Sequence, residues 1–264
     1  ISEWIIQLEN GPHILDRIAA INVLKNKNGR RNVENALLKS IESDSFWGVR
    51  QQAVYGLKNL KPKKYSKELM ELSENQDNRV RRAIWSALRN YKNNIPVSNF
   101  LQEIISTDLK YYSVSDAFRA LVVVDSSAAR KIVDTLLIRE SHTDVIRRSA
   151  ISYFGSVIND YNYERLKTLS SYGGTTWDAR PEAVSQLEKY IKGKKETLNL
   201  FIDFLNDPSR SVRRTSIRVL GKHGHKKHLG YLDELLQRDP ILKRDIRFAK
   251  KNILTGLKKN KKSK

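Results

Sequence analysis

The amino-acid sequence predicts an all-α solenoid built from about eight repeats of two helices each. The main observation is a nine-residue pattern that returns eight times, at intervals of 31 to 34 residues. The pattern begins with a small apolar residue, and the next position is usually Arg. Two variable residues, a small residue and, four positions later, an apolar residue follow. The second observation is that six Pro and twelve Gly are few, which suits helices joined by short turns. A fixed period of this length is typical of stacked repeats, each of which buries its apolar face against the next.

Three columns of residues define the register of the repeats. The Arg column comprises Arg17, Arg50, Arg81, Val114, Arg147, Arg180, Arg213 and Arg247. Three positions later, the Ala column comprises Ala20, Ala53, Ile84, Ala117, Ala150, Ala183, Ser216 and Lys250. Four positions beyond that, the Leu column comprises Leu24, Leu57, Leu88, Leu121, Phe154, Leu187, Leu220 and Leu254. Since a small side chain permits close approach of two helices, these columns predict a continuous right-handed solenoid over residues 1–257.

The third and seventh repeats show how each unit divides into two antiparallel helices. In the third repeat we expect helices over residues 64–73 and 80–90, separated by a turn at 74–77. In the seventh, residues 194–206 place apolar side chains on one face, and Asp207-Pro208-Ser209 breaks the chain and supplies an N-cap. The second helix of the seventh repeat is then expected over residues 212–221.

Two repeats depart from the pattern. The fourth has Val114 in the Arg column, directly after Tyr111 and Tyr112. The sixth has a longer junction, residues 170–176, between its two helices. Such loops are where solenoids carry variable binding groups.

Nine of the twenty net positive charges lie at the end of the chain, and the other eleven are spread along the solenoid. Residues 242–264 hold ten Lys or Arg against one Asp, and we expect residues 258–264 to form a basic, disordered tail. No stretch approaches the ~18 apolar residues of a membrane span, so we expect no membrane partner and a soluble monomer. The chain has no Cys, which excludes a disulfide framework and a thiolate metal site.

The Arg column is the most regular polar feature of the sequence. Arg at the start of a helix is electrostatically unfavourable, because the N-terminal end of the helix dipole repels cations. Carboxylates that lie shortly before these arginines would offset the repulsion: Asp44, Asp77, Asp144, Asp178, Asp207 and Asp245. We therefore expect a structural ladder of Asp caps and Arg–carboxylate pairs between repeats, with ligand contact by these arginines as the alternative.

Other cations and aromatic residues are candidates for a binding surface. Those that we single out are Arg79, Arg82, Arg148, Arg210, Arg214 and Trp177, with an ordinary solvated face as the alternative. Trp47 and Trp177 both lie three residues before the Arg column, which favours packing between repeats over recognition.

Nothing in the sequence predicts catalysis by this chain. His223, His225 and His228 form a compact cluster, but they lie in a cation-rich turn, which makes them weak candidates for metal ligands. We find no zinc-peptidase, nucleophile-elbow, phosphate-loop or dinucleotide motif. A binding role is therefore expected.

Residues 49–53 (Val-Arg-Gln-Gln-Ala) and 212–216 (Val-Arg-Arg-Thr-Ser) resemble the second helix of short HEAT-like repeats. Residues 44–53, with Phe46-Trp47-x-Val49-Arg50, and 141–150 are similar to the C-terminal HEAT-like domain of aminopeptidase N-type zinc metallopeptidases. That resemblance implies a helical domain that caps a preceding catalytic domain and restricts access of peptide substrates. Zinc would be bound in that preceding domain, since no zinc-ligand motif occurs here. The start at Ile1 led us to expect a piece of a longer polypeptide.

Two other functions remain open from the sequence. A nucleic-acid-binding solenoid would resemble the HEAT-like alkylpurine DNA glycosylases, with Trp177, Asp178 and Arg180 as a loose match. A general protein-interaction scaffold would bind its partner on the surface of the second helices.

Overall fold

The computed structural model describes residues 1–27, 30–60, 64–74 and 76–262, with side chains through residue 256. Over these residues the chain forms sixteen α-helices and five short 3-10 helices, with no strand. They fall into two compact units, residues 1–138 and 139–264. The predicted all-helical fold is confirmed.

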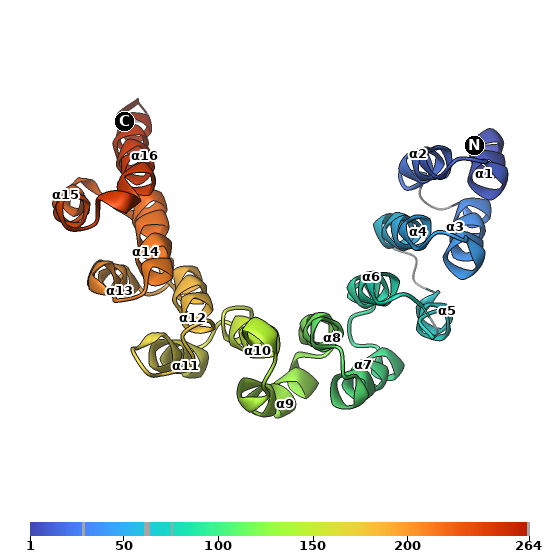
Figure 1. The fold of residues 1–264 in the computed structure, drawn as a ribbon, viewed down its shortest axis with the longest axis horizontal. Coiled ribbons are helices and arrows are strands. Elements are labelled where there is room, and N and C mark those ends of the chain that lie inside the picture. The colour runs from blue at the N-terminus through green and yellow to red at the C-terminus, as the bar shows by residue number, and fades with distance from the viewer. Residues whose placement is uncertain (28–29, 61–63, 75, 263–264) are drawn as a thin grey trace. The chain divides into compact units, whose positions relative to one another are not determined.

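Unit 1 contains four complete helix pairs and the first helix of the fifth. The pairs are α1 (Ser2–Asn10) with α2 (Ile14–Leu24), α3 (Arg31–Ser43) with α4 (Trp47–Leu60), α5 (Ser66–Glu71) with α6 (Asn78–Leu88), and α7 (Ile95–Thr107) with α8 (Tyr111–Val124), followed by α9 (Ser126–Ile138). Within this unit the second helices α2, α4, α6 and α8 form one layer, and the first helices α1, α3, α5 and α7 form a second layer next to it (Figure 1). This is the two-layer arrangement of a helical solenoid.

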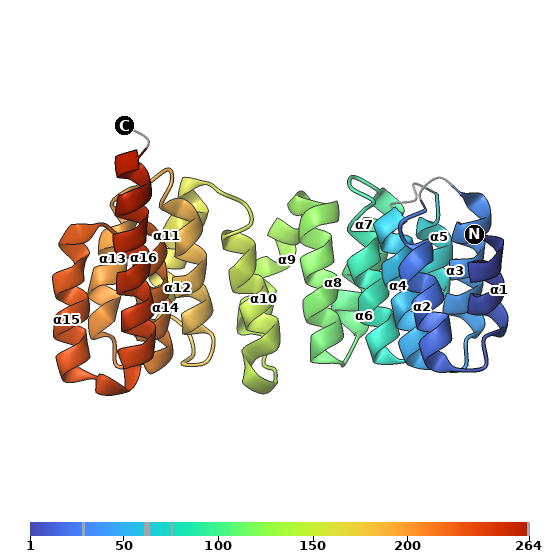
Figure 2. The ribbon, with the colours of Figure 1, turned by 90° about the horizontal axis from the view of Figure 1, so that it is seen from above.

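Unit 2 begins with α10 (Val145–Phe154) and contains three further pairs. These are α11 (Asp160–Ser170) with α12 (Arg180–Leu187), α13 (Thr197–Asp203) with α14 (Arg210–His223), and α15 (Leu229–Arg238) with α16 (Lys243–Lys262). The 3-10 helices all lie in this unit, at His142–Asp144, Glu188–Tyr190, Phe204–Asn206, Lys226–His228 and Pro240–Leu242. Within unit 2 the second helices α12, α14 and α16 contact one another in succession, and α14 and α16 run alongside each other (Figure 2).

The core is made of the columns that the sequence defines. Every residue of the Ala column from Ala20 to Ser216 has no exposed surface, and so does every residue of the Leu column from Leu24 to Leu220. The last repeat differs, because Leu254 is 45% exposed and Lys250 replaces the small residue. The periodic pattern thus identifies the buried seam between successive second helices.

Helix boundaries differ from expectation at the first helices of two repeats. In the third repeat α5 covers only Ser66–Glu71, inside the expected 64–73. In the seventh, α13 starts at Thr197 rather than at 194, and its last turn is the 3-10 helix Phe204–Asn206. Helix α14 begins at Arg210, directly after Ser209, whose backbone N–H donates to Asp207 Oδ1 at 2.8 Å. A side-chain hydrogen bond in the turn precedes α14, whereas no side chain caps the start of α5 or of α13.

The end of the chain bears on two expectations. Helix α16 is continuous through Lys262, and residues 263–264 lie outside the described residues, so the disordered tail at 258–264 stays a prediction. Among the described residues, every helix is too short or too polar to cross a membrane.

Candidate functional site

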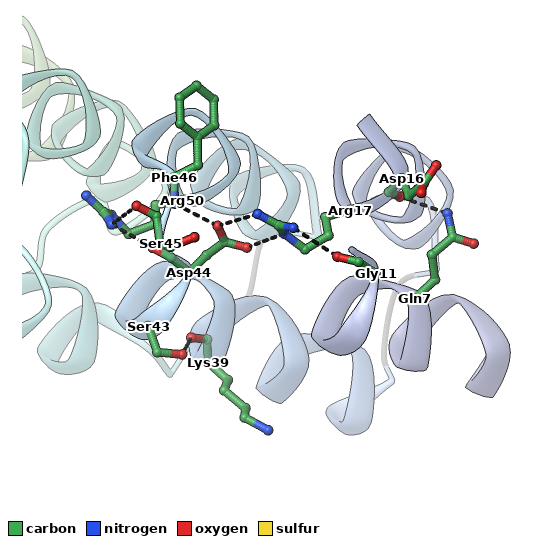
Figure 3. A network of polar contacts seen from close by, with 10 residues as sticks. All are labelled: Gln7, Gly11, Asp16, Arg17, Lys39, Ser43, Asp44, Ser45, Phe46 and Arg50. Carbon is green, nitrogen blue, oxygen red and sulfur yellow. Dashed lines mark hydrogen bonds and ion pairs between the residues drawn. The ribbon is translucent and has the colours of Figure 1, made fainter. Parts of the chain in front are cut away.

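The Arg column forms ion pairs between neighbouring repeats. Arg17 Nε lies 2.8 Å from Asp44 Oδ2, and its Nη1 donates to the Gly11 carbonyl at 2.9 Å, as Figure 3 shows. The acceptor Asp44 also receives a hydrogen bond from Phe46 N at 2.9 Å, at the start of α4. A single carboxylate thus caps the second helix of its own repeat and binds the arginine of the repeat before it.

Three more pairs repeat this geometry: Arg81 with Asp108 (2.8 Å), Arg180 with Asp207 (2.6 Å) and Arg213 with Asp239 (2.8 Å). The hydrogen bond from Arg213 lowers the pKa of Asp239 below its ordinary value. In each pair, the acceptor belongs to the repeat that follows the arginine. These arginines are therefore held within the scaffold.

The ladder is not uniform. Arg50 donates to the backbone carbonyl of Asp44 at 2.6 Å, and Arg147 pairs with Asp144 of its own repeat. Val114 is fully buried, and Arg247, in the last repeat, is exposed. Of the expected carboxylates, Asp178 is exposed and Asp245 pairs with Arg214 instead of with a column residue.

A basic cleft lies on the second helices of unit 1. It has a volume of about 310 Å³ and is lined by Gln51, Tyr55, Arg79, Arg82, Ser86, Arg89, Asp116 and Arg119. These residues come from α4, α6 with its C-terminal end, and α8, which are the second helices of three successive repeats. Four arginines therefore face one carboxylate in a single cleft.

Helical spacing explains why these residues converge. Arg82, Ser86 and Arg89 follow the i, i+4, i+7 rule and so lie on one face of α6. Because α4 and α8 both contact α6, stripes at the same register on these helices complete the walls of the cleft. The site is thus assembled by stacking rather than by one loop.

The arginines of the cleft differ in how they are held. Arg82 Nε lies 2.5 Å from Asp116 Oδ2, and the Arg79 guanidinium stacks 4.1 Å from the Trp47 ring centre. Arg89 and Arg119 are exposed, and neither forms an ion pair with a described residue. Burial, together with repulsion from Arg89, lowers the pKa of the nearby Lys58. The cleft is electropositive and has unneutralised donors.

Aromatic rings adjoin the cationic groups. Tyr55 lines the cleft and is 37% exposed, and Tyr112 is 43% exposed with the Arg82 guanidinium 5.0 Å from its ring centre. Trp47, for which we expected packing between repeats, carries Arg79 of the next repeat on its ring. This side of unit 1 therefore combines guanidinium groups with aromatic faces.

The structure does not bring the other predicted surface residues into the cleft. In unit 2, Arg148 lies 3.9 Å from Glu182, and Arg214 pairs with Asp245 at 3.1 Å. Arg210 is exposed at the start of α14. Trp177 is 55% exposed, with the Arg180 guanidinium 5.8 Å from its ring centre.

The residues that suggested a DNA-glycosylase-like site are not grouped for catalysis. Arg180 is 2% exposed and is bound to Asp207, while Asp178 is exposed to solvent. Of the three histidines, His225 and His228 contact each other, whereas His223 contacts Glu188. His223 Nε2 lies 3.0 Å from Glu188, and the buried His228 accepts a hydrogen bond from His225 N through Nδ1. No group of three or more metal-ligating side chains occurs in the described part of the chain.

Six residues of the cleft were missed by sequence reasoning: Gln51, Tyr55, Ser86, Arg89, Asp116 and Arg119. The spacing of Arg82, Ser86 and Arg89 was a usable signal, since it continues one helix face beyond the repeated pattern. No comparable signal connects Arg89 with Arg119, because the residues lie in different repeats.

Comparison with known proteins agrees with this architecture. A family model described as HEAT repeats matches residues 1–89, 34–122 and 166–249. The structure of human deoxyhypusine hydroxylase in complex with glycerol is 13% identical over 96% of each chain, with a TM-score of 0.44. The crystal structure of an engineered protein is 14% identical over 96% of each chain, with a TM-score of 0.28. None of the curated proteins matches the chain. Since the family model covers more than half of its length, the chain belongs to the HEAT-repeat family.

Proposed function

We propose that this chain is a non-catalytic HEAT-repeat scaffold that binds nucleic acid through the basic cleft of unit 1. The observation that carries the proposal is the convergence of Arg79, Arg82, Arg89 and Arg119 around one carboxylate, Asp116. The planar guanidinium group matches the geometry of a phosphate and binds it through two hydrogen bonds. Arg89 and Arg119, which form no ion pair with a described residue, are the expected phosphate ligands.

The aromatic rings favour a nucleic acid over an acidic polypeptide. Tyr55 and Tyr112 expose ring surface beside the arginines, and bases stack on such rings with little dependence on sequence. The carboxylates of an acidic peptide would pair with the arginines, but they would not stack on these rings. We therefore expect single-stranded nucleic acid to bind with phosphates on the arginines and bases on the tyrosines.

A capping role in a zinc aminopeptidase remains a second prediction. The residues that carry this resemblance have structural contacts here: the Phe46 and Trp47 rings lie 5.3 Å apart, and Arg50 donates to the Asp44 carbonyl. These contacts lie within the second repeat and hold the start of α4, so the HEAT fold alone accounts for the motif. The preceding catalytic domain, its zinc and the peptide substrate stay predictions from the resemblance.

Fluorescence anisotropy with a labelled single-stranded oligonucleotide tests the nucleic-acid proposal. We expect the double substitution R89A/R119A to weaken binding at least about tenfold and to reduce the slope of log K against log salt by about 1.4, because two phosphate contacts are lost. The matched control is R31A/R130A, which removes two arginines from the first helices α3 and α9 and should leave affinity within about twofold.

Two outcomes would overturn the proposal. Equal losses in R89A/R119A and in the control would mean that binding follows net charge rather than the cleft. Tighter binding of polyglutamate than of the oligonucleotide, abolished by R89A/R119A, would assign the cleft to an acidic protein partner.

A further inference from the structure

A long groove runs between α14 and α16 in unit 2. It shares no residue with the basic cleft of unit 1. Its volume is about 1070 Å³. Pockets for small ligands are typically about 300–1,000 Å³, so a groove of this size between two helices suits a peptide segment. Gly221 permits the close approach of its walls, since a Cβ there would lie 2.8 Å from Ala249 Cα.

One wall of the groove is a row of cations. Arg214, Arg218 and Lys222 lie on α14 at positions i, i+4 and i+8, which places them along one edge over about 12 Å. Their side chains are 57%, 51% and 66% exposed. The three cations are therefore spaced about one helical turn apart along α14.

The opposite wall carries one carboxylate, Asp245, and is otherwise neutral and partly aromatic. Phe248, Asn252 and Gly256 lie on α16, also at positions i, i+4 and i+8. Phe248 is 67% exposed, and a Cβ at Gly256 would meet no atom within 4 Å. Phe248 therefore presents an exposed apolar surface, and the α16 surface at Gly256, about 12 Å further along the helix, is open.

The carboxylates nearby leave the cationic row in excess. Arg214 pairs with Asp245 at 3.1 Å, whereas Arg218 and Lys222 share the single carboxylate of Glu188, at 2.6 and 2.8 Å. His223 also contacts Glu188. One carboxylate thus neutralises at most one of the two cations, and both Arg218 and Lys222 line the groove.

From this geometry we infer that the groove binds an acidic amphipathic helix of a partner protein. The apolar face of the helix packs on Phe248, and carboxylates at i, i+4 and i+8 along one flank meet Arg214, Arg218 and Lys222. Helix-in-groove recognition of this kind uses apolar anchors for affinity and a charged flank for orientation. This function is additional to nucleic-acid binding and does not depend on it.

The test uses a labelled 18-residue peptide designed as an amphipathic helix, with Leu on one face and Glu at i, i+4 and i+8 on its flank. Two comparison peptides carry Lys in place of each Glu or the same residues in scrambled order. By anisotropy, we expect the Glu peptide to bind and F248A to weaken it at least about tenfold, since an exposed side chain contributes contact energy without supporting the fold.

A charge exchange makes the test specific. R214E/K222E should lose the Glu peptide and gain the Lys peptide, and circular dichroism checks that each variant remains helical. R89A/R119A should bind the Glu peptide as the unaltered chain does, and F248A should keep oligonucleotide binding, so failure of one proposal leaves the other standing.

Equal binding of the scrambled peptide, or no effect of F248A, would overturn the inference. Loss of oligonucleotide binding in R214E/K222E without any peptide binding would show that the groove recognises phosphates instead. Concentration-dependent dimerisation abolished by F248A, without peptide binding, would assign the groove to a second copy of the chain.

Discussion

Arg180 and Asp207 form a two-point ion pair that joins the sixth repeat to the seventh. Both guanidinium Nη atoms donate to the carboxylate, with Nη1 2.6 Å from Oδ2, and the side chains are 2% and 7% exposed. The same carboxylate accepts a hydrogen bond from Ser209 N in the turn before α14. The junction therefore depends on one arginine and one aspartate that lie 27 residues apart.

Substitution of Arg180 by Met should destabilise unit 2 strongly. It leaves the Asp207 carboxylate buried without its cation, and such a loss costs about 3–5 kcal/mol in the free energy of unfolding. The double variant R180M/D207N should recover part of this loss, because no unpaired charge remains. Urea denaturation of the unaltered chain, R180M and R180M/D207N measures these differences. The control is R247M: Arg247 occupies the same column but is exposed, and its loss should cost less than about 0.5 kcal/mol. A small effect of R180M, equal to that of R247M, would contradict a stabilising ladder.

Two glycines should respond in opposite ways to alanine. At Gly221 the added methyl group would lie 2.8 Å from Ala249 Cα, so α14 and α16 must move apart at a cost of about 1–3 kcal/mol. At Gly230, in the first turn of α15, the methyl group meets nothing within 4 Å, and the better helix former should stabilise the protein by up to about 1 kcal/mol. Thermal unfolding of G221A and G230A compares the two. Equal shifts would mean that the close approach at Gly221 does not limit packing.

Glu188 should contribute stability that is lost in acid. Burial raises the pKa of Glu188, but hydrogen bonds from Lys222, Arg218 and His223 outweigh it and lower that pKa to about 2. Since the folded-state pKa lies below the ordinary 4.5, the contribution is complete above about pH 5 and disappears as the pH falls towards 2. Its size is about 1–2 kcal/mol, because the exposed cations are screened by solvent.

The variant E188Q isolates this contribution. The difference in unfolding free energy between the unaltered chain and E188Q should shrink between pH 5 and about pH 2.5, as judged by urea denaturation at each pH. A difference that stays constant over this range would show that Glu188 contributes through packing rather than charge.

Removal of residues 258–264 should not abolish nucleic-acid binding. The basic cleft contains none of these residues, although they carry five of the lysines in the chain. We expect the truncated chain to bind the labelled oligonucleotide with a smaller salt dependence but with the same tenfold loss on R89A/R119A. If truncation removes all binding, the tail and not the solenoid holds the ligand.

The fold was predictable because the residues that repeat with a fixed period are the buried ones. Ala53 and Leu57 recur with the same spacing as Ala183 and Leu187, and all four are fully buried. Helix starts were less predictable, since α5 and α13 begin without a side-chain cap and α14 begins after the turn in which Ser209 N donates to Asp207.

The direction of the ladder was also hidden. The sequence predicts Arg–carboxylate pairs between repeats, and its candidates include Asp44 and Asp207, which bind Arg17 and Arg180. It does not single out Asp108 and Asp239, which bind Arg81 and Arg213 from the repeat that follows. The rotation between stacked repeats decides which turn an arginine reaches, and a single sequence does not specify that rotation. The cleft was not predictable for the same reason. Arg82 was predicted as a surface residue, but whether it lines one cleft with Arg119 depends on how α6 stacks against α8.

A repeat that carries an arginine on its second helix and an aspartate at its turn is interchangeable with its neighbours. The seventh repeat contains both Asp207, which accepts from Arg180, and Arg213, which donates to Asp239. Duplication or deletion of this whole period leaves donors and acceptors matched on both sides of the new junction. A change of any other length would separate them. Evolution of this protein's length is therefore expected to proceed in steps of one repeat.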